Sequence, residues 1–251
     1  MFDPSTIPKF NIRAIKYDNF EIKDINNGDE FQLRINNERW MNINPSNYLT
    51  IQQMYSHYDI AHGNVLITGL GFGIAALWIA SKSTVKHVTV IERSPEVIDA
   101  FLKLNNKPEN MTIICEDANK FESINYFDCI LSDHFENENH NIILDSMRSL
   151  VKRVPNYGVV WFWPLELIYL EFTILQCDKF LENRKYDAFN FLFAETVWLK
   201  KNPIIFGNLW DSFCDKHIKN IKLAEHKLEY FYTYFNLLVQ QVGLEPTTTE
   251  L

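Results

Sequence analysis

The stretch from Asn64 to Glu92 constrains this chain more than any other, because two short apolar runs in it flank a glycine-rich turn and a helical pattern. The first run, Val65–Ile67, gives way to Gly-Leu-Gly-Phe-Gly at residues 69–73. Apolar residues at helical spacing follow, and a second apolar run at residues 88–91 ends in Glu92. The predicted order is strand, glycine turn, helix, and strand with a terminal acid. Nucleoside-binding α/β units begin in this way.

The glycine turn suits a nucleoside better than a nucleotide phosphate. Gly69, Gly71 and Gly73 let the backbone turn tightly and approach a ligand without Cβ interference. The sixth place of the dinucleotide pattern G-x-G-x-x-G is Ile74, and no Gly-Lys-Ser/Thr phosphate loop is present. With no Lys or Arg nearby, the turn favours an uncharged or zwitterionic nucleoside such as S-adenosylmethionine. The alternative is an α/β protein whose tight turn is glycine-rich for structural reasons alone.

Composition and charge narrow the class of protein. The length of 251 residues fits one large α/β domain, or one domain with a small attachment. The net charge of -8 argues against a non-specific nucleic-acid binder. Cysteines without C-x-x-C pairing favour a reducing cytoplasm, and we find neither a signal peptide nor an apolar run of about 18 residues that would cross a membrane. We expect a cytoplasmic protein whose partner is a small-molecule acceptor substrate, with no nucleic acid and no membrane; a homodimer is left open.

Residues 1–60 are predicted to form a β-rich N-terminal module with a linking helix. Three runs that alternate apolar and polar residues are expected as short antiparallel strands, at 10–15, 31–35 and 39–43. Turn signals lie at Asn26–Asp29 and at Asn36-Asn37. Pro45-Ser46 is expected to open a helix that continues to about Tyr58.

Residues 61–241 are predicted to form a Rossmann-like domain, with a seven-stranded, mostly parallel sheet and helices on both faces. Beyond the glycine unit, strands are expected at 111–115, 127–131 and 158–163, and helices at about 95–104, 138–153, 164–183 and 209–241. Ser94 is predicted to cap the first of these helices, with Pro95 in its first turn. A hairpin is expected at 188–206, and the tail 242–251 is predicted to be disordered.

Four polar features come at the carboxyl ends of successive predicted strands: the glycine turn, Glu92, Asp117 and Asp133. In open α/β sheets this edge is where ligands bind. Glu92 would accept hydrogen bonds from both ribose hydroxyls, and Asp117 would accept from the adenine amino group while the Ala118 amide donates to a ring nitrogen. Asp133 lies where the reacting centre is expected. It would hold or deprotonate an attacking amine, or bind the ligand's ammonium group.

Each candidate also has a purely structural interpretation. Glu92 would cap the next helix, Asp117 would be the N-cap of a short helix that reaches Phe121, and Asp133 would be a solvated loop acid. His134 is interpreted as a loop residue rather than a base. The histidines are scattered and no H-E-x-x-H spacing occurs, so we expect no metal site.

Several of these motifs occur together in one known superfamily. An apolar V-L-I-x-G run precedes the glycines, with Ile67 where ordinary methyltransferases usually have an acid. Val-Ile-Glu at 90–92, Glu-Asp-Ala at 116–118 and the strand at 127–133 follow, and the last is similar to Y-D-V-I-I-x-D. The stretch 64–163 thus resembles a class I S-adenosylmethionine-dependent methyltransferase core, most closely the spermidine synthase branch. The resemblance implies S-adenosylmethionine as cofactor and a transferase activity.

The chain also departs from the spermidine synthase pattern. The acid of that branch's glycine loop, G-G-G-D-G-G, is Phe72 here, and Trp40 lies near the place of its N-terminal glutamine. A diamine substrate needs carboxylates at both ends of its pocket, and Asp133 and Glu136 supply one end only. We therefore expect methyl transfer to an unidentified small acceptor, bound between the N-terminal module and the region after Trp163. The alternatives are aminopropyl transfer from decarboxylated S-adenosylmethionine and a non-catalytic nucleoside-binding module.

Overall fold

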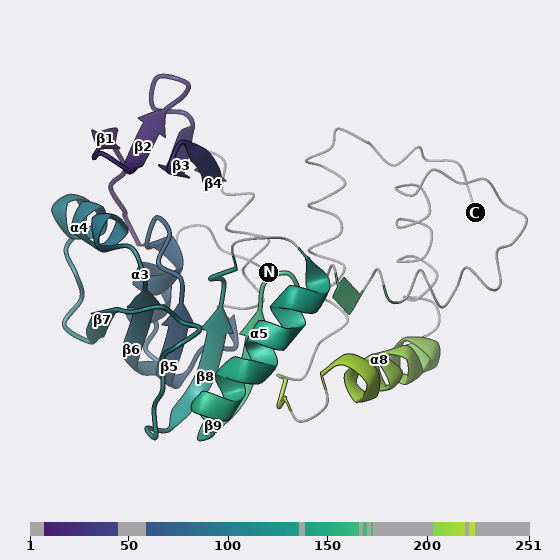
Figure 1. The fold of residues 1–251 in the computed structure, drawn as a ribbon. Coiled ribbons are helices and arrows are strands. Elements are labelled where there is room, and N and C mark those ends of the chain that lie inside the picture. Colours follow the sequence, from purple (N-terminus) through teal and green to yellow (C-terminus); the bar gives the residue numbers. More distant parts are fainter. Residues whose placement is uncertain are drawn as a thin grey trace, which may run out of the picture.

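The computed structural model describes residues 8–44, 59–135, 139–165, 168–169, 172, 203–218 and 221–223. These residues form two sheets (Figure 1). One is antiparallel, with the order β1-β2-β3-β4, and the other is parallel, with the order β7-β6-β5-β8-β9. The Rossmann-like prediction is confirmed. The predicted count of seven strands is not met by the described residues, which place five strands in the parallel sheet.

The parallel sheet consists of β5 (Gly63–Thr68), β6 (Val85–Glu92), β7 (Met111–Cys115), β8 (Phe127–Ser132) and β9 (Tyr157–Phe162). Its strands are near-continuous apolar runs because both faces are covered, and Val65 and Ile130 have no exposed surface. The chain runs outward from β5 through β6 to β7 and then crosses to β8 and β9 on the other side. The strand order therefore reverses beside β5. Thr68 is level with both Ile91 and Ser132, so the three strands end at one edge.

The helices that connect these strands are α3 (Ile74–Ser81), α4 (Pro95–Leu104) and α5 (His140–Arg153). The predicted cap of α4 is confirmed, because Ser94 Oγ accepts a hydrogen bond from the Val97 amide at 3.2 Å. Figure 1 shows α5 lying along β8 and β9, and Met147 and Leu150 of α5 are completely buried. The expected one-sided apolar pattern of α3 differs from the structure, in which this helix is buried around most of its circumference.

The N-terminal sheet consists of β1 (Ile15–Lys16), β2 (Phe20–Asp24), β3 (Phe31–Ile35) and β4 (Glu38–Ile43). The predicted strand at 10–15 is wrong in extent, since only Ile15 of that run joins the sheet, and β2 was missed. The turn at Asn36-Asn37 is confirmed. Both residues have positive φ, 51° and 64°, as a two-residue hairpin turn requires.

Contacts with α4 hold the N-terminal sheet next to the parallel one. Tyr17 Oη donates to Asp99 Oδ2 at 2.5 Å, and Lys103 Nζ lies 2.7 Å from the same carboxylate oxygen. Asn11 and Asn105 exchange two hydrogen bonds, from Asn11 N at 2.8 Å and from Asn105 Nδ2 at 3.3 Å. The small sheet is therefore fixed at its first strand, before the chain turns into β3 and β4.

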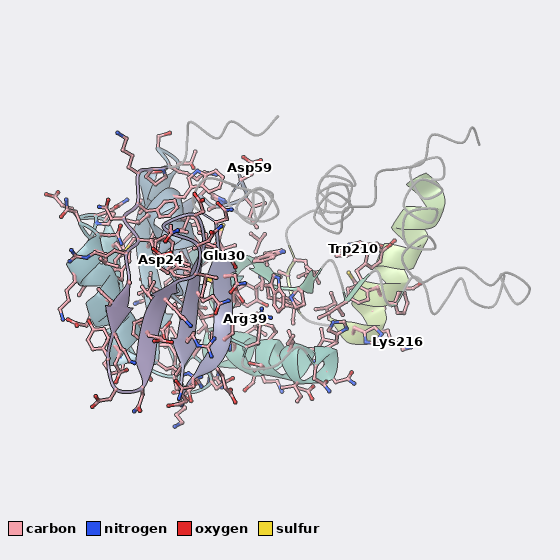
Figure 2. All side chains as sticks on the ribbon, turned by 90° about the horizontal axis from the view of Figure 1, so that it is seen from above. Asp24, Glu30, Arg39, Asp59, Trp210 and Lys216 are labelled. Atoms are coloured by element: carbon pink, nitrogen blue, oxygen red, sulfur yellow. The ribbon has the colours of Figure 1, made fainter. Side chains whose placement is uncertain are left out.

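The C-terminal third departs most from the sequence expectations. Helix α8 (Pro203–His217) begins inside the segment predicted as a hairpin and ends well before residue 241. Leu223 then forms a parallel bridge with Val160 of β9. Phe213 is completely buried and its ring lies 5.3 Å from that of Tyr169, so these aromatics form core. Figure 2 shows Trp210 and Lys216 of α8 far from Asp24, Glu30 and Arg39 of the N-terminal sheet.

Several predicted elements lie outside the described residues. They are the helix at 45–58, most of the helix at 164–183, most of the hairpin at 188–206, the helix beyond residue 223, and the tail at 242–251. Glu136, named above beside Asp133, lies outside them too. None of the described helices is long and apolar enough to cross a membrane.

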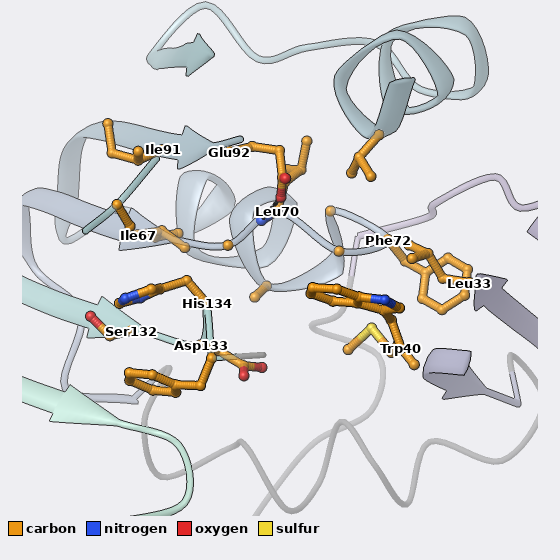
Figure 3. Close-up of a pocket in the computed structure, with 18 of the residues that line it drawn as sticks. Leu33, Trp40, Ile67, Leu70, Phe72, Ile91, Glu92, Ser132, Asp133 and His134 are labelled. Atoms are coloured by element: carbon orange, nitrogen blue, oxygen red, sulfur yellow. Dashed lines mark hydrogen bonds between the residues drawn. The ribbon is translucent and has the colours of Figure 1, made fainter. Parts of the chain in front are cut away.

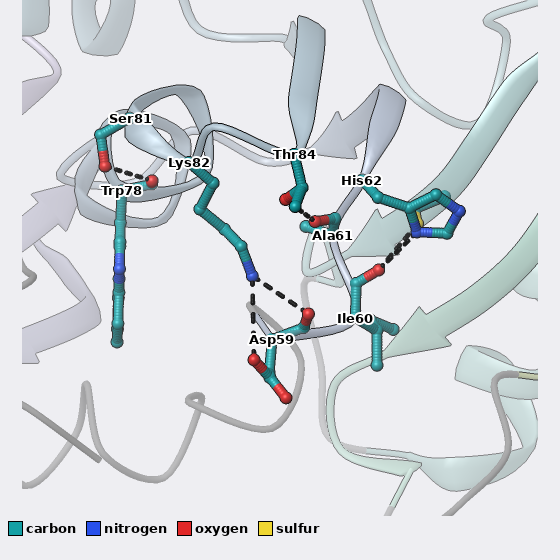
Figure 4. A network of polar contacts seen from close by, with 9 residues as sticks. Asp59, Ile60, Ala61, His62, Trp78, Ser81, Lys82 and Thr84 are labelled. Atoms are coloured by element: carbon teal, nitrogen blue, oxygen red, sulfur yellow. Dashed lines mark hydrogen bonds and ion pairs between the residues drawn. The ribbon is translucent and has the colours of Figure 1, made fainter.

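The amino end of β5 is secured at the edge opposite the glycine turn (Figure 4). Lys82 Nζ donates to the Asp59 carbonyl at 3.0 Å and lies 4.0 Å from its carboxylate. Thr84 Oγ1 donates to the Ala61 carbonyl at 3.2 Å. Burial lowers the pKa of Lys82. These contacts tie the segment after α3 to the residues just before the central strand.

Candidate functional site

A cavity of about 180 Å³ lies at the carboxyl ends of the parallel strands (Figure 3). All seven residues predicted from the sequence line it: Gly69, Gly71, Gly73, Glu92, Asp117, Ala118 and Asp133. Strands β3 and β4 supply its other wall, with Leu33, Ile35, Trp40, Met41, Asn42 and Ile43. The structure thus brings the predicted residues together beneath the N-terminal sheet, at the point where the strand order reverses.

The glycines serve packing as well as the turn itself. Gly69 has φ of 92°, and a Cβ there would lie 2.1 Å from the Asp133 carbonyl oxygen. A Cβ on Gly71 would lie 3.2 Å from Met41 Sδ in the opposite wall. Close approach of a ligand, as predicted from the sequence, is therefore only one of two reasons why glycine is needed at these positions. At Gly69 the end of β5 needs the space to pass the backbone after β8.

Glu92 binds two backbone amides. Its Oε2 accepts from Leu70 N and its Oε1 from Ser94 N, each at 2.9 Å. The carboxylate thereby joins the glycine turn to the start of α4, so the capping interpretation is partly right. Each carboxylate oxygen has a second lone pair, and both ribose hydroxyls can still donate to it.

Asp117 and Ala118 lie in a turn that α5 holds in place. Asp117 Oδ1 accepts from the Asn119 amide at 2.9 Å, and the Asp117 carbonyl accepts from Phe121 N at 3.0 Å. Arg153 donates to the carbonyls of Ala118 and Phe121, at 3.0 and 3.1 Å. The capping interpretation of Asp117 is thus only partly right, because the segment that its carboxylate caps is a turn and not the expected short helix. The same turn presents Asp117, Ala118 and Asn119 to the cavity.

Asp133 follows β8 directly and its carboxylate faces the space next to Trp40 and Leu70 (Figure 3). Its backbone amide donates to the Thr68 carbonyl at 2.8 Å, which fixes its position beside the end of β5. Burial raises the pKa of Asp133 to about 6. Asp133 is therefore a partly buried loop acid that lines the cavity, and this position argues against the interpretation as a fully solvated acid.

A polar relay beside Asp133 was not predicted from the sequence. His134 Nδ1 lies 2.7 Å from Thr68 Oγ1, and His134 Nε2 lies 3.2 Å from Ser146 Oγ. Ser146 Oγ donates to Asn119 Oδ1 at 2.8 Å. Burial lowers the pKa of His134 to about 4, so the ring is neutral at physiological pH. His134 follows β8 as predicted, but it is a partly buried residue that links the end of β5 to α5 rather than a simple loop residue.

Other features of the wall also escaped the sequence reasoning. The Arg93 guanidinium lies over the Trp40 ring, 4.8 Å from its centroid, and joins the end of β6 to β4. Among the described side chains, Ser132 Oγ and Asn42 Oδ1 are buried without a hydrogen-bond partner, and both residues line the cavity. A polar residue that ends an apolar strand was the available signal for Thr68 and Ser132. No described group of three or more His, Cys, Asp or Glu is arranged to hold a metal ion.

A comparison with known protein families matches the same part of the chain. Residues 65–153 match the family model described as a methyltransferase domain. The chain is similar to the plantazolicin methyltransferase BpumL in complex with a triazolic desmethylPZN analog and SAH, with 24% identity over 46% of this chain and 45% of that one and a TM-score of 0.34. It is also similar to the N-methyltransferase NodS from Bradyrhizobium japonicum WM9 in complex with S-adenosyl-l-homocysteine, with 21% identity, 45% and 58% coverage and a TM-score of 0.37.

A third similar structure is the spermidine synthase from Thermotoga maritima, with 17% identity, coverage of 58% of this chain and 54% of that one, and a TM-score of 0.41. The chain thus spans about half the length of these solved structures. No curated protein matches the sequence.

The family match begins in β5 and ends with α5, and it includes the glycine turn, Glu92, Asp117 and Asp133. The parallel sheet of these residues has its order reversal beside the glycine turn. Residues 65–153 therefore match a methyltransferase domain, a family that uses S-adenosylmethionine, and they lie in a parallel sheet of Rossmann-like order.

Proposed function

We propose that the cavity binds S-adenosylmethionine and that the protein transfers its methyl group to a small acceptor. One observation carries this proposal. The glycine turn, Glu92, Asp117 and Asp133, which follow four successive strands of the matched methyltransferase domain, line a single cavity.

The lining residues suggest how the cofactor lies. The free lone pairs of Glu92 accept from the two ribose hydroxyls, while its other contacts keep the glycine turn in place. Asp117 accepts from the adenine amino group and the Ala118 amide donates to N1 of the ring. This orientation directs the sulfonium end of the ligand along the glycine turn toward Asp133.

The chemistry at Asp133 follows from its protonation. The acceptor nitrogen or oxygen attacks the methyl carbon, the new bond forms as the carbon–sulfur bond breaks, and the sulfur keeps the electron pair as S-adenosylhomocysteine. The acceptor's surplus proton passes to the Asp133 carboxylate. Because burial raises the pKa of Asp133 to about 6, this carboxylate is ionised at neutral pH and is a better base than an ordinary aspartate. In-line positioning of the acceptor supplies the rest of the rate enhancement.

The acceptor space is the part of the cavity beneath the N-terminal sheet. Apolar and aromatic side chains from both sheets and from the loops after β5 and β8 line it: Leu33, Trp40, Met41, Phe72, Phe135 and Trp161. This lining excludes water from the reacting centre and favours an acceptor with an apolar body and one nucleophilic amine or hydroxyl.

Mass analysis of the nucleoside product tests the proposal. The protein is incubated with S-adenosylmethionine or with its decarboxylated form, each with a pool of small amines and alcohols. Methyl transfer predicts S-adenosylhomocysteine from the first donor, in an amount that depends on the acceptor pool. Methylthioadenosine from the second donor alone would establish aminopropyl transfer instead. Absence of both products, with the cofactor bound, would leave a nucleoside-binding module.

A further inference from the structure

We propose that Asn119 reads the base of the bound nucleoside by donating a hydrogen bond to N7 of adenine, and that His134 is the positioning residue that fixes the orientation of the Asn119 amide. This inference rests on the proposed function, because it requires an adenosine in the cavity. It concerns the chain of hydrogen bonds Thr68–His134–Ser146–Asn119.

The direction of each hydrogen bond follows from the number of available protons. The Ser146 hydroxyl has one hydrogen, which it donates to Asn119 Oδ1 at 2.8 Å. Ser146 Oγ must therefore accept from His134 Nε2, 3.2 Å away, so the proton of the imidazole is on Nε2. His134 Nδ1 is then a bare acceptor, and Thr68 Oγ1 donates to it at 2.7 Å. Burial, which lowers the pKa of His134 to about 4, keeps the ring in this neutral form.

The relay begins at a buried position and ends at an exposed one. Thr68 is the last residue of the central strand β5 and has no exposed surface. Asn119 is an exposed residue at the mouth of the cavity, and its amide group would rotate freely without a partner. His134, in the loop after β8, and Ser146, in α5, transmit the fixed orientation of the strand end to this side chain.

The orientation decides what Asn119 offers to a ligand. Because Oδ1 accepts from Ser146, the end left available by the relay is Nδ2, which carries two N–H donors. In the proposed pose Asp117 and Ala118 take the 6-amino group and N1, and N3 lies on the ribose side. N7 is the remaining acceptor, and it is adjacent to the 6-amino group. Asn119 follows Ala118 directly, so its donor is placed along this edge.

The test compares the affinity of S-adenosylhomocysteine with that of its 7-deaza analogue, in which C–H replaces N7. Wild-type protein should prefer S-adenosylhomocysteine by about tenfold, the scale of one net hydrogen bond. Asn119→Ala and His134→Phe should both reduce this preference to about one. His134→Gln should restore it, because the glutamine carbonyl accepts from Thr68 and its amide donates to Ser146. Ser146→Ala removes the hydroxyl that links His134 to Asn119, so it should also reduce this preference to about one. This second variant keeps the test possible if His134→Phe folds poorly.

Three results would overturn the inference. Equal affinity of the wild type for both ligands would show that N7 receives no hydrogen bond, although binding of S-adenosylhomocysteine itself would leave the proposed function standing. A full preference in Ser146→Ala and His134→Phe would remove the positioning role. If S-adenosylhomocysteine did not bind at all, the proposed function would fail and the inference with it.

Discussion

Replacing Asp133 by asparagine should make the stability of the protein less dependent on pH. Burial raises the pKa of this carboxyl to about 6 in the folded protein, from the ordinary value of 3.8. The unfolded chain therefore loses its proton at a lower pH than the folded protein does. Stability from the protonated carboxyl is fully present below pH 3.8 and is lost as the pH rises through about 6. The amide side chain of the variant does not ionise and avoids this loss.

The two pKa values set the expected size. Between pH 4 and pH 8, ionisation of Asp133 should lower the free energy of unfolding of the wild type by about 2 kcal/mol. At pH 4 the folded carboxyl is protonated and neutral, like the amide that replaces it, so the two proteins should be nearly equally stable. At pH 8 Asp133→Asn should be the more stable protein by about 2 kcal/mol.

Urea denaturation of both proteins without ligand, at pH 4, 6 and 8, measures this difference. Each pair at one pH serves as its own control, because all other titrating groups are shared. A stability difference that stays constant from pH 4 to pH 8 would refute the reasoning. It would mean that the Asp133 carboxylate is solvated or paired when ionised, and so is not the poised base of the proposed reaction.

Three further predictions follow from the site. Glu92→Ala should weaken binding of S-adenosylhomocysteine by about 1.5–3 kcal/mol in calorimetry and also lower the free energy of unfolding by about 1–3 kcal/mol, because Glu92 also binds the amides of Leu70 and Ser94. Gly69→Ala should lower stability by about 3 kcal/mol or more in urea denaturation, whereas Gly28→Ala, at nearly the same φ (93° against 92°) but with nothing within 4 Å, should cost only about 1–2 kcal/mol. Equal losses would exclude the clash with Asp133. Asp133→Asn should retain cofactor binding while turnover falls by about 10²–10⁴-fold, and wild-type turnover would remove Asp133 from the reaction.

The sequence was most informative where the signals are local. The glycine turn, the acid that ends β6 and the Ser94 cap each occupy a few consecutive residues, and short-range geometry decides their structure. Parallel strands with level ends then bring their carboxyl-terminal residues together, so Asp117 and Asp133 could be placed at one edge without coordinates.

Contacts between distant segments were not predictable in the same way. The relay through His134 joins residues 66 and 12 positions apart, and no local pattern indicates such a pairing. The two amides bound by Glu92 depend on how the glycine turn folds back toward β6. The predicted element boundaries were also wrong where apolar residues fit more than one structure. The residues before Leu209 were predicted as part of a hairpin, but α8 begins among them, at Pro203.

The most direct test of the central claim is calorimetric titration of the wild-type protein with S-adenosylhomocysteine and, separately, with NAD. We predict saturable binding of S-adenosylhomocysteine at one site and no heat from NAD, since the glycine turn has Ile74 at the sixth place of the dinucleotide pattern and Glu92 remains free to accept from the ribose. Binding of NAD without binding of S-adenosylhomocysteine would contradict the account.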